Sequence, residues 1–196
     1  ITLQPIVVPQ DVQKRITVIH DGIDTDKVCP NPAARVKLPE SDLEFAAGDE
    51  VLTFINRNLE PHRGFHIFMR ALPAVLKARP NAHVVIIGGD GVSYSPKAPN
   101  NKTWRERLVD EAGDRLDLSR VHFAGRVPYN VFVDLMRASR VHAYLTYPFV
   151  LSWSLLEAMS AGAFVIGSRT APVEEVIQDG VNGRLVDFFD IQAWSA

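Results

Sequence analysis

Residues 51–89, VLTFINRNLEPHRGFHIFMRALPAVLKARPNAHVVIIGG, decide the fold that this sequence predicts. The stretch begins with an apolar run over 51–55. It ends with a second run over 84–87, whose unbroken apolar character is typical of a strand buried in a parallel sheet. Between them, apolar residues recur over 65–78 close to the 3.6-residue period of a helix, in which Pro73 predicts a kink. A strand, a helix and a strand in this order predict two parallel strands joined by a helical crossover.

The same alternation continues to the end of the chain. It predicts strands at 121–123, 141–145, 164–166 and 184–186, and helices at 104–112, 130–138, 151–161 and 172–178. Upstream, residues 1–15 are predicted to be a linker or arriving segment and 16–19 a short strand. Residues 24–49, with three prolines, are predicted to be a loop with at most a short helix. We expect an α/β fold: a Rossmann-like domain over residues 16–196 whose parallel sheet carries helices on both faces.

Composition and charge limit the possible functions. The chain has 196 residues, 46% of them hydrophobic and 22% charged, which is ordinary for a globular domain. Its net charge of -2 supplies no basic field for nucleic acid or an anionic membrane, so a few placed cations would have to hold a phosphate ligand. The single cysteine excludes an internal disulfide. No signal peptide or apolar run of about 18 residues is visible, so we expect a cytoplasmic location.

Two segments that follow predicted strands and open predicted helices carry the candidate site. In sheets of this kind, ligands bind at the carboxyl ends of the strands, beside helix N-termini. The first segment places Arg57 near a strand end and Arg63 near a helix start, where two guanidiniums would face one diphosphate. Gly64 would let the backbone approach a ligand closely. Two solvated surface arginines are the competing interpretation.

The second segment leads into the helix predicted at 151–161. Free N–H groups of Leu151, Ser152 and Trp153 at its start would form an anion site, and Glu157 would accept hydrogen bonds from ribose hydroxyls. Ser154 and Glu157 also match a capping box, in which the carboxylate merely binds backbone. That alternative starts the helix late and leaves it short, so we prefer the earlier start.

These segments resemble the C-terminal domain of family-4 glycosyltransferases, which have the GT-B fold. Members show an Arg and, six residues later, a Lys followed by Gly, where this chain has Arg57 and then Arg63-Gly64. They also show a segment Leu-Leu-Glu-Ala-Met-x-x-Gly, which is matched by residues 155–162. Three more stretches match in the family's order: VIHDGID at 18–24, VHFAGRV at 121–127 and DGVNGRLV at 179–186.

The resemblance implies a role for each candidate residue. Arg57 and Arg63 would be the catalytic residues, binding the donor diphosphate and stabilising the departing nucleoside diphosphate. Glu157 would hold the ribose, and the backbone around Arg126 and Val127 would meet the base. Residues 151–153 would face phosphate and donor sugar. Such enzymes retain anomeric configuration and need no bound metal, and no cofactor is expected.

The resemblance also implies partners. The donor would be a hexose-type sugar linked to UDP, GDP or ADP. The acceptor would be a glycan or lipid-linked molecule, bound by an N-terminal domain that we expect to lie outside this chain. The full-length enzyme would act in bacterial polysaccharide biosynthesis, in the cytoplasm or peripherally at the inner membrane face. The isolated chain would bind nucleotide but transfer little or no sugar.

Departures from the family pattern keep other functions open. Phe149 stands where the family usually has Glu, eight residues before Glu157 and near the transferred sugar. Arg63 replaces the usual Lys, and Asn56 replaces the Gly before the first arginine. The alternatives are a nucleotide-sugar epimerase or phosphorylase domain of GT-B fold, and a catalytically inactive nucleotide-sugar-binding module.

Three weaker signals are given no role. Asp24-Thr25-Asp26 matches a metal–nucleotide motif of a different fold, but so short a match is common by chance. His62 and His66 have a spacing that suits a metal on a helix, yet no third ligand is evident. The GGDG turn at 88–91 lacks the dinucleotide-binding spacing. No metal site is predicted.

Overall fold

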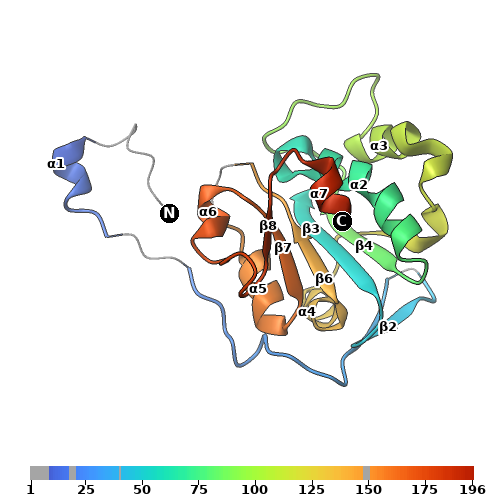
Figure 1. Cartoon of the computed structure of the whole chain (residues 1–196), viewed down its shortest axis with the longest axis horizontal. Coiled ribbons are helices and arrows are strands. Elements are labelled where there is room, and N and C mark those ends of the chain that lie inside the picture. The colour runs from blue at the N-terminus through green and yellow to red at the C-terminus, as the bar shows by residue number, and fades with distance from the viewer. Residues whose placement is uncertain (1–8, 18–20, 40, 148–150) are drawn as a thin grey trace.

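The computed structural model describes residues 9–17, 21–39, 41–147 and 151–196. Its centre is a six-stranded parallel sheet with the strand order β5-β4-β3-β6-β7-β8 (Figure 1). The strands are β3 (Val51–Asn58), β4 (His83–Gly89), β5 (Val121–Gly125), β6 (Val141–Tyr144), β7 (Phe164–Ser168) and β8 (Arg184–Val186). This is the doubly wound order of a Rossmann-like fold, so the predicted fold class is confirmed.

Helices cover both faces of the sheet (Figure 1). One face carries α2 (Phe65–Ala78), α3 (Trp104–Ala112) and α7 (Ile191–Ser195), and the other carries α4 (Tyr129–Ala138), α5 (Trp153–Ala161) and α6 (Ala171–Glu174). The short helices are α1 (Gln10–Gln13), η1 (Pro61–Arg63), η2 (Gly113–Arg115) and η3 (Leu118–Arg120). The helices predicted at 65–78 and 104–112 begin and end where the sequence places them, and α2 continues through Pro73. The helix predicted at 172–178 is shorter than expected and corresponds to α6, which ends at Glu174.

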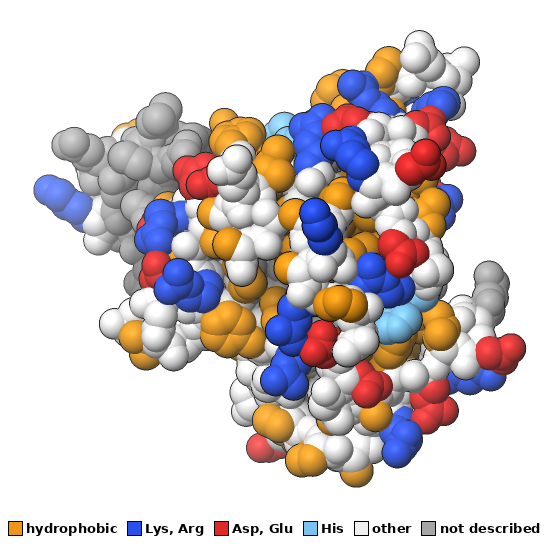
Figure 2. Space-filling view, turned by 45° about the vertical axis from the view of Figure 1, so that its right-hand side comes forward, with side chains coloured by type: hydrophobic (Ala, Val, Ile, Leu, Met, Phe, Trp, Pro, Cys, Tyr) orange, Lys and Arg blue, Asp and Glu red, His pale blue; other side chains and the backbone are white. Residues whose placement is uncertain are grey.

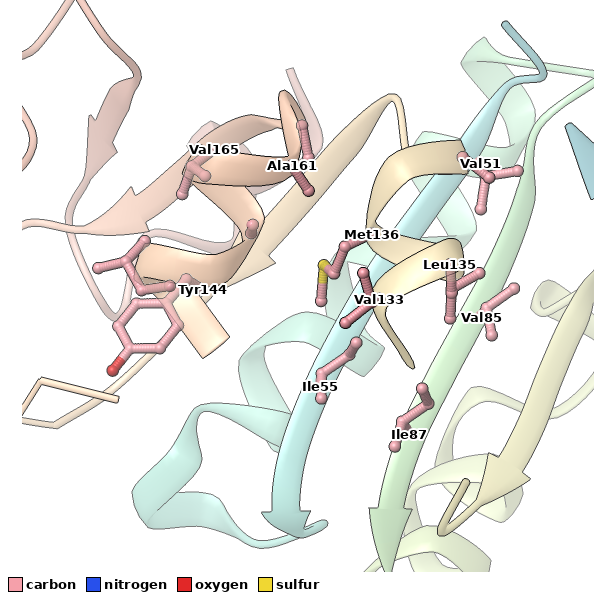
Figure 3. Packing of buried hydrophobic residues seen from close by; sticks show 14 of the residues in the cluster. Val51, Ile55, Val85, Ile87, Val133, Leu135, Met136, Tyr144, Ala161 and Val165 are labelled. Atoms are coloured by element: carbon pink, nitrogen blue, oxygen red, sulfur yellow. The ribbon is translucent and has the colours of Figure 1, made fainter. Parts of the chain in front are cut away.

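Two hydrophobic cores form because side chains alternate along the strands. In β3, Phe54 joins the core under α2 and Ile55 joins the core under α4, and in β4 Ile86 and Val85 divide in the same way. Figure 3 shows Met136 of α4 lying over Ile55. Each fully buried aliphatic side chain stabilises the fold by about 1.5–3 kcal/mol, so these contacts fix both strands and the loops that leave them.

A small hairpin lies outside the main sheet. β1 (Arg35–Lys37) pairs antiparallel with β2 (Glu44–Ala46), so the prediction that 24–49 is loop with at most a short helix was wrong here. Strands of three residues are too short to show a clear alternation, and the nearby prolines favoured a loop. The buried side chains of Val36 and Phe45 join the core under α4.

The surface carries both signs of charge. Figure 2 shows Lys and Arg side chains among Asp and Glu side chains over one face. In the described part of the chain, no helix combines the length and the apolar character that crossing a membrane requires. A charged ligand therefore has to be recognised by local groups of side chains rather than by the overall field.

Candidate functional site

The order of the strands reverses direction between the neighbouring strands β3 and β6, which makes this the topological switch point of the sheet. β4 and β5 lie on one side and β7 and β8 on the other, so the connections leaving β3 and β6 diverge at the carboxyl edge. Ligands of doubly wound sheets bind at this place. The two loops also touch: the Tyr147 N–H donates to the His62 carbonyl at 3.1 Å, and their rings meet edge to face at 5.6 Å. Residues 59–64, 145–147 and 151–152 frame the candidate site.

Arg57 lies near the carboxyl end of β3. The pairing of β3 with β4 shifts register between Ile55 and Asn58, and such an irregularity re-aims the side chains within it. Arg57 is exposed, whereas Ile55 and Asn58 are buried. No hydrogen bond or ion pair with another described residue occupies its guanidinium. Within the described part of the chain, nothing therefore competes with an anion for this side chain.

η1 and the start of α2 hold Arg63 and Gly64 against the end of β6. Gly64 has a φ of +71°, and a Cβ there would lie 2.2 Å from the Leu145 Cβ. Only glycine allows this approach, which brings the start of α2 to the switch point. Burial raises the pKa of the Tyr144 hydroxyl at the end of β6, and the charge of Arg63 opposes that rise. A contact between Gly64 and a ligand stays a prediction.

A distant loop supports Arg63. The guanidinium carbon lies 5.4 Å from the centre of the Tyr94 ring, a cation–π contact. Buried Glu60 holds this loop, because its Oε2 accepts hydrogen bonds from the N–H groups of Ser93, Tyr94 and Ser95 at 2.9, 3.0 and 2.9 Å. Burial acts to raise the pKa of Glu60, but the three donors and the Arg63 charge outweigh it and lower the pKa.

Helix α5 begins at Trp153, with Ser152 as its N-cap residue. Ser154 lies inside the helix, so the capping-box interpretation of Ser154 and Glu157 was wrong. The predicted set of free N–H groups also needs a correction, because the Ser152 N–H donates to the Tyr144 hydroxyl at 2.9 Å. A hydroxyl from the end of β6 therefore fills one of the three expected anion-binding positions, and the contacts of this helix start with a ligand stay predictions.

The other predicted residues of this segment divide between core and surface. Leu151 is partly buried against the core under α4. Trp153 is 61% exposed, and its indole N–H donates to the Asp21 carboxylate at 3.2 Å, which ties the segment around 21–24 to α5. Phe149 lies outside the described residues, as do residues 18 and 19 of the strand predicted at 16–19, and residues 16 and 17 are not in a strand.

Glu157 is nearly buried on α5, with 9% of its surface exposed. Its Oε1 accepts a hydrogen bond from the Tyr129 hydroxyl at 2.8 Å. The hydrogen bond to the carboxylate raises the pKa of Tyr129. Tyr129 is the first residue of α4 and follows the loop that holds Arg126 and Val127. The candidate ribose residue is thus tied to the helix that follows the candidate base loop.

The loop after β5 lies beside the turn after β4. Arg126 is exposed, and its guanidinium nitrogens lie 3.4 Å from the position that a Cβ on Gly89 would take. Val127 is partly buried against the core under α4. The Asn58 amide donates to the Ser93 hydroxyl at 2.7 Å, which connects the end of β3 to the same region. The 88–91 turn therefore lies at the carboxyl edge.

The motifs that were given no role have local explanations. Asp24 pairs with Lys27 at 2.9 Å and accepts hydrogen bonds from the Asp26 and Lys27 N–H groups, which makes a short turn. Burial lowers the pKa of His66 to about 4, and its ring contacts that of Phe188. Among the described residues, no three His, Cys, Asp or Glu side chains gather in a way that could hold a metal ion.

The structure therefore brings some of the predicted site residues together at the end of β6 and places others away from it. Arg63, Gly64 and the start of α5 meet around the end of β6, whereas Glu157 is tied to α4 and Arg57 contacts none of them through a hydrogen bond among the described residues. Sequence reasoning missed Glu60 and Tyr129. Glu60 did carry a signal, because an acid between two phosphate-binding arginines would weaken the site unless its charge were committed elsewhere. Tyr129 carried none.

Comparison with known proteins places these elements in a family. The model of the family "Glycosyl transferases group 1" matches residues 40–196, more than half of the chain. The chain is 25% identical over 182 residues to the D-inositol 3-phosphate glycosyltransferase of Corynebacterium urealyticum, covering 92% of this chain and 41% of that protein. It is 26% identical over 179 residues to a GDP-mannose-dependent alpha-(1-6)-phosphatidylinositol monomannoside mannosyltransferase of Mycolicibacterium smegmatis, covering 88% and 43%. The chain thus spans about two-fifths of these relatives.

Two solved structures share the fold. The C-terminal domain of the glycosyl transferase group 1 family protein LpcC from Francisella tularensis has a TM-score of 0.68 at 21% identity, over 89% of this chain and 84% of that one. HepE from Anabaena, in complex with UDP-glucose, has a TM-score of 0.60 at 23% identity, over 76% and 37%. The sheet is that of the C-terminal half of a GT-B glycosyltransferase. Because the family model spans every strand and loop that frames the site, the chain belongs to the glycosyl transferases group 1 family.

Proposed function

We propose that this chain is the nucleotide-diphospho-sugar-binding domain of a retaining, metal-independent glycosyltransferase. The observation that supports the proposal is the seating of Gly64 against Leu145, directly after β6, together with the Arg63 charge acting on the Tyr144 hydroxyl that binds the Ser152 N–H ahead of α5. A diphosphate at this place would meet a guanidinium from one loop and helix N–H groups from the other. Glu157, further along α5, would accept hydrogen bonds from the ribose.

The chemistry follows from the placement of positive charge. As the bond between the anomeric carbon and the β-phosphate oxygen breaks, negative charge grows on the departing diphosphate. Arg57 and Arg63 would stabilise this charge, and fixed charges aimed at a developing anion are a large term in catalysis. The cation–π contact with Tyr94 and the loop held by Glu60 would keep Arg63 in position. Both arginines are therefore proposed as catalytic residues that touch the donor.

The donor and acceptor are proposed more broadly. The HepE structure is a complex with UDP-glucose, and the M. smegmatis relative is named as GDP-mannose-dependent. A hexose-type sugar on UDP, GDP or ADP is accordingly the proposed donor, and a glycan or lipid-linked molecule is the proposed acceptor. The acceptor would bind a second, N-terminal domain, in a protein that acts in the cytoplasm or at the inner membrane face.

Calorimetric titration of this chain with UDP, GDP and ADP, in the presence of a chelator, tests the proposal. One nucleotide is expected to bind. Arg57→Ala and Arg63→Ala should each remove a charged hydrogen bond of about 1.5–3 kcal/mol, which weakens binding roughly 10- to 100-fold. Arg140→Ala is the matched control, because Arg140 is exposed and directly precedes β6, at the opposite edge of the sheet. Failure of every nucleotide to bind, or equal affinities in the arginine variants and the wild type, would refute the site.

A further inference from the structure

The hydrogen bond between Tyr129 and Glu157 joins two helices at the candidate ribose site. The Tyr129 hydroxyl donates to the Glu157 Oε1 at 2.8 Å, from α4 to α5. Tyr129 is 61% exposed and Glu157 is 9% exposed. An exposed side chain of one helix therefore reaches a nearly buried carboxylate on the next.

The carboxylate needs this donor. A buried charge that lacks hydrogen bonds is costly, and among the described residues Tyr129 is the only hydrogen-bond donor to Glu157. The Tyr129 hydroxyl satisfies Oε1, and no other described residue donates to Oε2, which is open to solvent or to a ligand. The arrangement is half complete, and it would be completed by hydroxyl donors of a ligand.

The donor is also held in place. Tyr129 follows Pro128, whose ring restricts the backbone at the start of α4. Its ring stacks on that of Phe132, with centroids 5.8 Å apart and an interplanar angle of 21°. The hydrogen bond to Glu157 raises the pKa of Tyr129, so the phenol stays a donor at neutral pH. Backbone, stacking and protonation therefore all keep the hydroxyl directed at Glu157.

We propose that Tyr129 is a positioning residue that fixes the Glu157 carboxylate so that Oε2 faces the ribose diol, and that this makes the site selective for ribonucleotides over 2′-deoxyribonucleotides. The inference rests on the proposed function. A site built to accept a hydrogen bond from a ligand hydroxyl discriminates against the analogue that lacks it, because a buried acceptor is then left unpaired. That penalty is large only while the carboxylate cannot turn away, and Tyr129 prevents the turn.

The test measures a ratio of affinities rather than one affinity. Whichever of UDP, GDP and ADP binds the chain is titrated beside its 2′-deoxy counterpart, into the wild type, Tyr129→Phe and Glu157→Gln. We expect the wild type to prefer the ribonucleotide roughly 10- to 100-fold, the scale of one hydrogen bond to a charged group. Tyr129→Phe keeps the ring and its stacking on Phe132 but should lower the preference several-fold. Glu157→Gln should nearly abolish it.

Each outcome separates the inference from the proposed function. If Tyr129→Phe only loosened the site in general, it would weaken the binding of both nucleotides equally and leave the ratio of their affinities unchanged. That result overturns the positioning role. A wild type that binds ribo- and deoxyribonucleotides equally overturns the inference while the nucleotide site stands. A wild type that binds no nucleotide overturns the proposed function itself. Urea unfolding midpoints of the variants show that the fold is retained.

Discussion

Replacing Gly64 by alanine perturbs the contact that brings the start of α2 to the end of β6. The new Cβ would lie 2.2 Å from the Leu145 Cβ, whereas carbon atoms pack best at about 3.5–4.0 Å. Moving the two elements apart is an overpacking change that costs about 1–3 kcal/mol. An alanine at the φ of +71° adds strain of about 1–2 kcal/mol. The expected destabilisation is therefore about 2–5 kcal/mol, a large share of the stability of a domain.

Gly180 offers a matched control for this prediction. Its φ is +77°, close to that of Gly64, but a Cβ there would meet nothing within 4 Å. Gly180→Ala should therefore carry the backbone strain alone, of about 1–2 kcal/mol. Urea unfolding of the two variants and the wild type gives the difference, which we expect to be about 1–3 kcal/mol. Equal destabilisation of the two variants would refute the argument from the Leu145 contact.

Two further predictions concern buried titratable groups. Burial lowers the pKa of His142 to about 4 from 6.5, so the unfolded chain binds the proton first as pH falls. The contribution of His142 to stability is complete above about pH 6.5 and is lost as the pH falls towards 4, by about 3 kcal/mol. Urea unfolding across that range should therefore show that the stability of His142→Leu depends less on pH than that of the wild type. A variant with the same slope as the wild type contradicts this. Glu60→Gln replaces a charged acceptor, whose hydrogen bonds are roughly twice as strong as neutral ones, so amide exchange at 93–95 should accelerate. Unchanged exchange would show that another group holds the loop.

The elements that the sequence predicted well are those with a long periodic pattern. α2 and α3 each bury one stripe of apolar residues, so their bounds follow from the pattern itself. The hairpin of β1 and β2 has only three residues in each strand, and it packs on the core under α4, which lies far away in the sequence. The start of α5 was placed two residues early, because the Tyr144 hydroxyl binds the Ser152 N–H ahead of the helix.

The candidate site was predictable where it depends on the ends of strands. Arg57, Arg63 and Gly64 follow directly from a strand–loop–helix unit, whose carboxyl edge is known once the strand is known. The support for these residues comes from elsewhere in the chain. Glu60 binds backbone 33 to 35 residues away, and Tyr129 binds a carboxylate 28 residues away. Such pairs depend on how elements pack together, which periodicity does not encode.

The Glu60 contact has a consequence for how the domain can vary over evolution. The carboxylate is bound by main-chain N–H groups of residues 93–95, and main-chain donors are the same in every residue except proline. Residues 93–95 can therefore change their side chains without losing the bond to Glu60, whereas a change at Glu60 removes it whatever the loop contains. The Tyr94 side chain is constrained for a different reason, its contact with Arg63. Glu60 thus fixes where the loop lies, and the loop side chains determine what it does there.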